Sequence, residues 1–195
     1  MIKTIPAQLI LDSELISVEE TYPLLSLPEL HPQLTAAEVL ALDLPAKNRV
    51  DALLRHEFLE ERQLRELACD FVEHTLHVYE IRSPDDSRPR KCVAAARLRL
   101  SGAVSQGELQ TIIKEAIRSV WRFEGTEFAG AFQAGCAATF LGGMDAGEIA
   151  RLVAAYTQRA AHREAWERRG SNLQLMTGRE REAMWQLRRI VKKIS

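Results

Sequence analysis

Apolar residues recur at helical spacing along most of the chain, and this periodicity constrains the fold more than any other feature. The clearest case is the segment 60–82, where Leu64, Leu67 and Phe71 begin a stripe that continues to Tyr79. Residues three and four apart share one face of an α-helix, so such a stripe marks a buried helix face. No segment alternates apolar and polar residues for long enough to indicate a strand. The pattern predicts an all-α protein.

Helix-start and helix-stop signals divide the stripes into separate elements. Thr35 and Glu38 have the spacing of a capping box, Pro45 suits a first helical turn, and Asp85 or Asp86 can cap the helix that carries Pro89. The predicted helices span residues 35–42, 45–58, 60–82, 86–101, 105–125, 128–142, 145–169 and 179–194, with a turn from 170 to 178.

The short connections between these segments favour antiparallel neighbours. We therefore expect a single-domain antiparallel helical bundle, or a two-layer helical array, of about seven to eight helices. Residues 1–34 contain four prolines and are the least regular part. We interpret them as an N-terminal arm with a short helix near Val18–Leu25, packed on a domain formed by residues 35–195.

Composition limits the class of protein. Apolar residues make up 46% of the chain and charged residues 27%, which is typical of a globular domain. No long apolar run suggests a membrane span, and the first residues lack a secretory signal. Cys69, Cys92 and Cys136 lie in apolar helical patterns, so we expect packed thiols in a reducing cytoplasm. No motif for a cofactor or a catalytic nucleophile is present, so none is predicted.

Four potential metal ligands lie on one predicted helix. Asp70, Glu73, His74 and His77 are spaced so that one helical surface presents all of them. They suggest a metal-dependent enzyme as an alternative. The simpler interpretation is a solvated polar face, because Glu73 and His77 lie nearly opposite the apolar stripe.

The segment Pro84–Arg90 is unusually dense in charge. Asp85 and Asp86 stand beside Arg88 and Arg90, between two prolines. One interpretation is a turn that satisfies itself through local ion pairs, which contribute little to stability. The other is a recognition corner whose arginines bind carboxylates or phosphates of a partner.

The tryptophans and the basic C-terminal end offer further surfaces. Trp121 and Trp185 lie off their apolar stripes and Trp166 lies near a helix end, yet burial within the monomer is the expected state of all three. Trp185 could instead anchor a partner or a homodimer. Lys192 and Lys193 suit a helix C-terminus, and without a wider basic face nucleic-acid binding is not expected.

Three stretches resemble one family of bacterial immunity proteins. They are LPAKNR at 44–49, LACDFVEH at 67–74 and PDDSRPRK at 84–91, with weaker similarity over 128–165 and at Trp185-Gln186. Together they resemble the immunity-five-like group of polymorphic toxin systems, whose members are alanine-rich and helical. The second half departs from that pattern through bulkier Phe, Ile and Arg residues. The resemblance implies a cytoplasmic protein that neutralises a cognate toxin, and it supplies no catalytic residues.

The leading hypothesis is therefore a non-enzymatic protein-binding module without a cofactor. It would bind a toxin through Asp85, Asp86, Arg88 and Arg90, with Trp185 as a further anchor. The alternatives are the metal-dependent helical enzyme and a helical regulator that binds nucleic acid through the C-terminal lysines.

Overall fold

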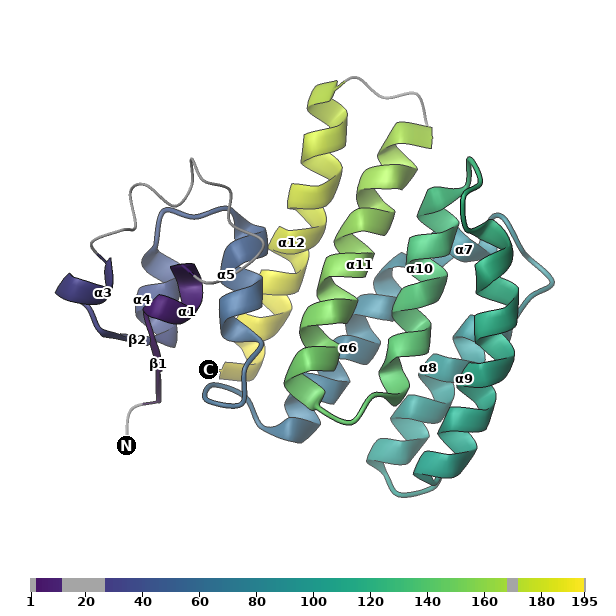
Figure 1. Ribbon diagram of the computed structural model, residues 1–195, viewed down its shortest axis with the longest axis horizontal. Helices are drawn as coiled ribbons and strands as arrows, with labels where there is room; N and C mark the ends of the chain where they lie inside the picture. The colour runs from purple at the N-terminus through teal and green to yellow at the C-terminus, as the bar shows by residue number, and fades with distance from the viewer. Residues whose placement is uncertain (1–2, 12–26, 168–171, 195) are drawn as a thin grey trace.

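Two layers of helices make up most of the structure, a computed structural model that describes residues 3–11, 27–167 and 172–194. In Figure 1, α10, α11 and α12 lie side by side, and α6 and α8 run behind them. Within the described residues, seven helices have eight residues or more, namely α5, α6, α8, α9, α10, α11 and α12. The predicted all-α class and the array of about seven to eight helices are confirmed.

The elements follow one another along the chain in Figure 1. Their bounds are β1 Thr4–Pro6, α1 Gln8–Leu11, α3 Leu27–Leu30, β2 Gln33–Thr35, α4 Ala36–Ala41, α5 Ala46–Leu53, α6 Glu61–Thr75, α7 His77–Glu80, α8 Arg88–Leu100, α9 Gln106–Val120, η2 Trp121–Phe123, α10 Ala129–Thr139, η3 Phe140–Gly142, α11 Ala146–Glu167 and α12 Asn172–Ile194. The elements η2 and η3 are single turns of 3₁₀-helix.

Polar side chains start several helices where the sequence predicts them. Thr35 and Glu38 form a reciprocal capping box at α4. Ser105 does the same at α9. At α11, Asp145 Oδ1 accepts a hydrogen bond from the backbone N–H of Glu148 at 2.6 Å. Each cap satisfies amides that would otherwise lack a partner, and so fixes where the helix begins.

The apolar stripe of α6 lies at the centre of the core. Leu64, Leu67 and Phe71 are fully buried, as are Val72 and Tyr79 further along the chain. Helix α6 packs against α11 of the other layer and α8 of its own, so it holds the two layers together. Burial of such side chains is the dominant favourable term in folding, worth roughly 1.5–3 kcal/mol for each large apolar residue.

Small residues let α10 approach its neighbours closely. A Cβ atom added at Gly135 would lie 2.7 Å from Val120 Cγ2 and 3.0 Å from Tyr79 Cδ2. Four alanines of α10 are also buried, because only small side chains fit between α9, α7 and α11: Ala131, Ala134, Ala137 and Ala138. The small residues of α10 are thus required for close packing of the neighbouring helices.

Three predicted helix boundaries are wrong. The helix predicted over 45–58 ends at Leu53, and residues 54–58 form turns. The predicted helix 60–82 divides at Leu76 into α6 and α7, because Thr75 Oγ1 hydrogen-bonds to the carbonyl of Phe71 and the Tyr79 N–H bonds to the Leu76 carbonyl, tightening the turn. The predicted turn 170–178 is mostly helix, since α12 begins at Asn172. Gly178 serves close packing there, because an added Cβ would lie 3.0 Å from the Ala161 carbonyl oxygen of α11.

A short antiparallel ribbon, which the sequence did not predict, joins β1 to β2. Ile5 pairs with Leu34, and both side chains are buried in the main core. Strands of three residues are too short to show an alternating pattern. The helix predicted near Val18–Leu25 lies outside the described residues, and the boundary at residue 34 remains a prediction.

The three cysteines are buried and unpaired, as predicted. Burial raises the pKa of each thiol to about 12, so these side chains are packing groups rather than nucleophiles at neutral pH.

Among the described helices, none combines the length and the apolar character that crossing a bilayer requires.

Candidate functional site

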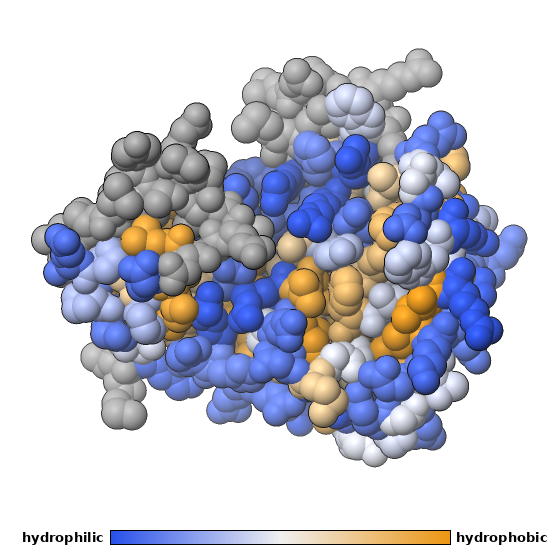
Figure 2. All heavy atoms as spheres, in the orientation of Figure 1, coloured by the Kyte–Doolittle hydropathy of each residue, from blue (hydrophilic) through white to orange (hydrophobic). Residues whose placement is uncertain are grey.

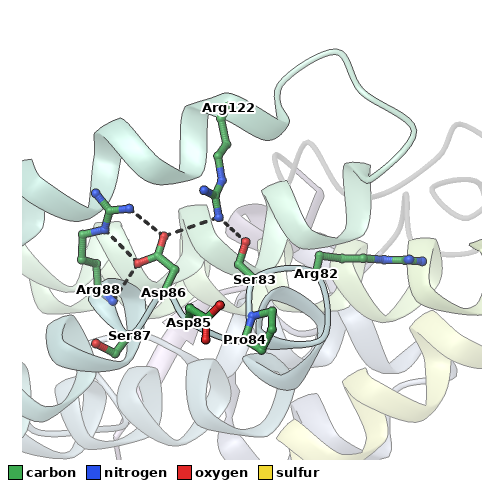
Figure 3. A pocket seen from close by; sticks show the side chains of 8 residues that line it. All are labelled: Arg82, Ser83, Pro84, Asp85, Asp86, Ser87, Arg88 and Arg122. Atoms are coloured by element: carbon green, nitrogen blue, oxygen red, sulfur yellow. Dashed lines mark hydrogen bonds and ion pairs between the residues drawn. The ribbon is translucent and has the colours of Figure 1, made fainter.

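The charged segment between α7 and α8 borders an open hollow of about 590 Å³ (Figure 3). The segment is short because Pro84 follows the end of α7 and Pro89 occupies the first turn of α8. We call this hollow and its rim the basic corner. It is lined by Arg82, Ser83, Pro84, Asp85, Asp86, Ser87, Arg88 and Arg122.

Asp86 holds the basic corner together. Arg88 donates from Nε to Oδ1 at 2.8 Å, from Nη2 to Oδ2 at 3.0 Å and from its backbone N–H to Oδ1 at 3.1 Å. Tyr79 donates its hydroxyl to Oδ2 at 2.7 Å. Arg122 Nη2 lies 3.6 Å from Oδ2 and also donates to Ser83 Oγ. Only 7% of the Asp86 side chain is exposed, so its carboxylate is an internal tie between α7, α8 and η2.

These contacts determine the charge state of the group. Burial acts to raise the pKa of Asp86, but the hydrogen bonds from Arg88 and Tyr79 outweigh it and hold the pKa far below its usual range. The same bond raises the pKa of the Arg88 guanidinium. Burial is the largest influence on the Tyr79 hydroxyl and raises its pKa. The corner therefore presents a fixed carboxylate between two permanent cations.

The two interpretations of the segment each hold in part. Arg88 pairs with Asp86, as a self-satisfied turn requires, whereas Arg90 pairs instead with Glu80 through bonds of 2.6 and 2.8 Å. Asp85 is exposed and makes no hydrogen bond or ion pair with the rest of the described chain. In Figure 3, Arg88 and Arg122 approach Asp86 from opposite sides, while Arg82 points away along the rim. Arg82 lies over the Phe128 ring at 4.6 Å.

Arg122 is the residue of this corner that the sequence did not reveal. It lies in η2, directly after α9 and 36 positions after Asp86 in the numbering, and the packing of α8 on α9 brings the two together. No local motif at Arg122 signals that role.

Trp185 lies in a different hollow, between α6, α11 and α12. Its ring stacks on His74 with centroids 3.8 Å apart, and meets Phe71 edge-on at 6.0 Å. The hollow measures about 970 Å³ and also contains Met184, which is 37% exposed. The structure therefore places Trp185 in a hollow of its own rather than at the corner that carries Asp85, Asp86, Arg88 and Arg90.

The four potential metal ligands do not converge. Asp70 binds Arg97 at 2.8 Å and also Arg189, and Glu73 binds Arg97 at 2.6 Å. His74 and His77 each bond to a separate glutamate. Over the part of the chain that the structure describes, no group of three His, Cys, Asp or Glu residues could hold a metal ion. Arg97 and Arg189 bind the two carboxylates, so these four residues do not form a metal site in the described structure.

Each histidine has its own acidic partner. His74 Nδ1 lies 2.8 Å from Glu182 Oε2, and the Glu182 side chain is 3% exposed. His77 Nε2 lies 3.2 Å from Glu164 Oε1. These pairs join α6 and α7 to α12 and α11. They connect the layers of the fold.

The basic C-terminal end is partly neutralised within the fold. Lys193 Nζ lies 2.7 Å from Glu66 Oε2, and Arg189 binds Asp70. Hydrogen bonds from Lys193 and Arg62 lower the pKa of Glu66 and outweigh burial, which acts to raise it. Lys192 remains exposed. One exposed lysine and a partly paired neighbour make a weak basis for nucleic-acid binding.

The expected burial of all three tryptophans is wrong for two of them. Trp121 is 54% exposed and Trp166 is 58% exposed, whereas Trp185 is partly buried. Trp121 follows the last residue of α9, where the helix face turns outward, and Trp166 lies in the last turn of α11. Trp121 directly precedes Arg122 of the basic corner, and an exposed tryptophan beside charged side chains is a common mark of a binding region.

Charge is distributed unevenly over the molecule. Residues 82–122 carry nine lysines and arginines against four acids, whereas residues 27–61 carry three against seven. Figure 1 shows α8 and α9 at one end of the long axis and α4 and α5 at the other. The segment 82–122 therefore carries an excess of positive charge, part of which Glu80 and Glu73 neutralise, although the whole chain has a net charge of −1.

Comparison with known proteins gives one match. A family model described as "Imm-5 like putative immunity protein" matches residues 56–192, which include the basic corner, the Trp185 hollow and all helices from α6 to α12. Neither the curated proteins nor the solved structures contain a significant match.

Proposed function

We propose that this chain, which belongs to the Imm-5 like family of immunity proteins, protects its host by binding a toxin and neutralising it without catalysis. The proposed contact is the basic corner. Its partner would be a toxin that presents carboxylates, because two guanidiniums face the hollow and the segment 82–122 carries an excess of positive charge.

The observation that carries this proposal is the fixing of Arg88 and Arg122 by Asp86. Their Nη1 groups make no bond to other described residues, while their other nitrogens are held in place. A side chain that is already ordered loses less conformational entropy when a partner binds. The corner thus supports bidentate recognition at a surface, while Asp86 itself stays inside.

A co-expression experiment tests the proposal. The product of each gene that flanks this one in its native genome is induced in a heterologous bacterium, with and without this chain. We expect one product to arrest growth and this chain to restore it, with a stable complex recovered on gel filtration. Arrest that this chain never relieves refutes the immunity function.

A steric variant tests the corner itself. Asp85→Trp places a large side chain at the hollow without removing any bond of the described structure, and Asp43→Trp does the same on an exposed site near α5. We expect Asp85→Trp to raise the Kd for the toxin by at least about tenfold and Asp43→Trp to change it by less than about twofold. Equal affinity of both variants would rule out the corner as the contact.

A further inference from the structure

The outward face of α9 has the composition of an interface centre. Lys114, Ile117, Arg118 and Trp121 are spaced by three and four residues, which places them on one stripe of the helix. Ile117 is 37% exposed and Trp121 is 54% exposed, while Lys114 and Arg118 are also exposed. Figure 2 shows apolar side chains among hydrophilic ones over this part of the molecule. We call these four residues the α9 stripe.

Trp121 is held in position although its surface is open. Its ring meets the Phe132 ring of α10 edge-on, with centroids 6.2 Å apart and an angle of 83°. A braced indole keeps its apolar area available without a large loss of side-chain freedom on binding. Tryptophan and arginine are the residues most enriched among those that dominate binding energy.

The charges of the stripe indicate the chemistry of its partner. Lys114 and Arg118 form no hydrogen bond or ion pair within the ranges that the structure describes, unlike Arg90 and Arg97, which are paired. Glu115 is the acid nearest to them along α9. Arg122 continues the helix from the stripe into the basic corner, so the two surfaces adjoin. An acidic surface complements both.

We propose that the α9 stripe is the second half of the toxin contact, and that it takes an acidic surface of the toxin with an apolar pocket for Trp121. This inference rests on the proposed immunity function. The basic corner would then bind carboxylates, and the stripe would supply the apolar anchor that a charged corner lacks.

The probe is the toxin that this chain neutralises in the growth assay, purified as an inactive variant. Binding is measured for Trp121→Ala and Arg118→Glu. Trp166→Ala and Arg163→Glu are matched controls, because both residues are exposed on α11, away from the stripe. Thermal unfolding of each variant confirms that it is folded. All substitutions are made in the full chain.

We expect each stripe variant to raise the Kd by at least about tenfold and each control to change it by less than about twofold. Association of the unaltered chain should slow between about 50 and about 500 mM NaCl, and Arg118→Glu should weaken that dependence. If the unaltered chain binds the toxin and the stripe variants bind equally well, the stripe is excluded while the immunity function stands. If the unaltered chain binds no toxin, both proposals fail.

A nucleic acid is the competing acidic partner. A mixed-sequence DNA duplex and a single-stranded RNA are therefore tested at low salt with the unaltered chain and with Arg118→Glu. We expect no retention of either. Retention that Arg118→Glu abolishes, together with unchanged toxin binding, overturns the inference in favour of a nucleic-acid surface.

Discussion

Replacing Asp86 by alanine removes the tie at the basic corner, and its effect follows from the contacts of one carboxylate. The change deletes three hydrogen bonds from Arg88 and one from Tyr79. It also leaves Arg88 and Arg122 facing each other with no anion between them. The Tyr79 hydroxyl keeps Ser119 Oγ as a partner at 3.2 Å.

The size of the loss depends on how far water can replace those bonds. Removal of one member of a buried ion pair costs about 3–5 kcal/mol. The Arg88 and Arg122 side chains are 42% and 48% exposed, so water solvates them once the carboxylate is gone. We therefore expect the lower limit, about 3 kcal/mol of unfolding free energy. For a chain of this length, that loss lowers Tm by about 6–12 °C.

The pH dependence gives an independent check on the same contacts. The folded pKa of Asp86 lies below its unfolded value of about 3.9. Its contribution is therefore complete above that unfolded value, and is lost as the pH falls toward the folded pKa. The difference in unfolding free energy between the unaltered chain and Asp86→Asn should be constant near neutral pH and shrink below about pH 4.

Chemical denaturation followed by circular dichroism measures these free energies. Asp85→Ala is the matched control, because the neighbouring carboxylate is exposed and makes no bond among the described residues, so stability should not change. An Asp86→Ala protein that unfolds within about 1 kcal/mol of the unaltered chain would show that the tie contributes little, and would remove the basis for a preordered corner.

Three further changes test the packing and the buried polar groups. Gly135→Leu forces a side chain against Val120 and should cost about 3 kcal/mol by denaturation, with no loss expected if α9 and α10 were loosely packed. Gln186→Leu removes the acceptor for Gln158 Nε2 and a donor to Glu182, both buried, so it should cost about 1–3 kcal/mol. The three buried thiols should resist an aromatic disulfide reagent in native protein and react once it is unfolded; rapid native reaction would contradict their placement.

The sequence predicts those features that depend on neighbours along the chain. Periodicity predicted the helices and side-chain spacing predicted the capping box at Thr35, since both features arise within a few residues. The extent of α12 through Gly178 could not be predicted, because the reason for glycine there is the close approach of Ala161 on another helix, which leaves no room for a Cβ atom. Propensity alone treats such a glycine as a turn.

For the candidate site, too, only the local features could be predicted from the sequence. Charge density identified Asp85, Asp86, Arg88 and Arg90 as a distinct segment, yet pairing decides which of them stays available, and pairing is tertiary. Arg90 is taken by Glu80 on α7, and Asp86 is bound on several sides. The surroundings of Asp70 and Glu73 likewise depend on tertiary pairing, because arginines from other helices bind both carboxylates.

The described arginines differ in what they bind. Those that face a carboxylate on another helix, such as Arg97 between α8 and α6 and Arg189 between α12 and α6, connect the two layers. Arg97 donates hydrogen bonds to Glu73 and Asp70, and these bonds raise the pKa of its guanidinium although burial acts to lower it, so Arg97 is charged at neutral pH. Arg118 has no such carboxylate within the described structure. Arg97 and Arg189 can therefore contribute mainly to stability, whereas Arg118 can offer its charge to an acidic partner, as Arg88 and Arg122 can offer their unbonded Nη1 groups.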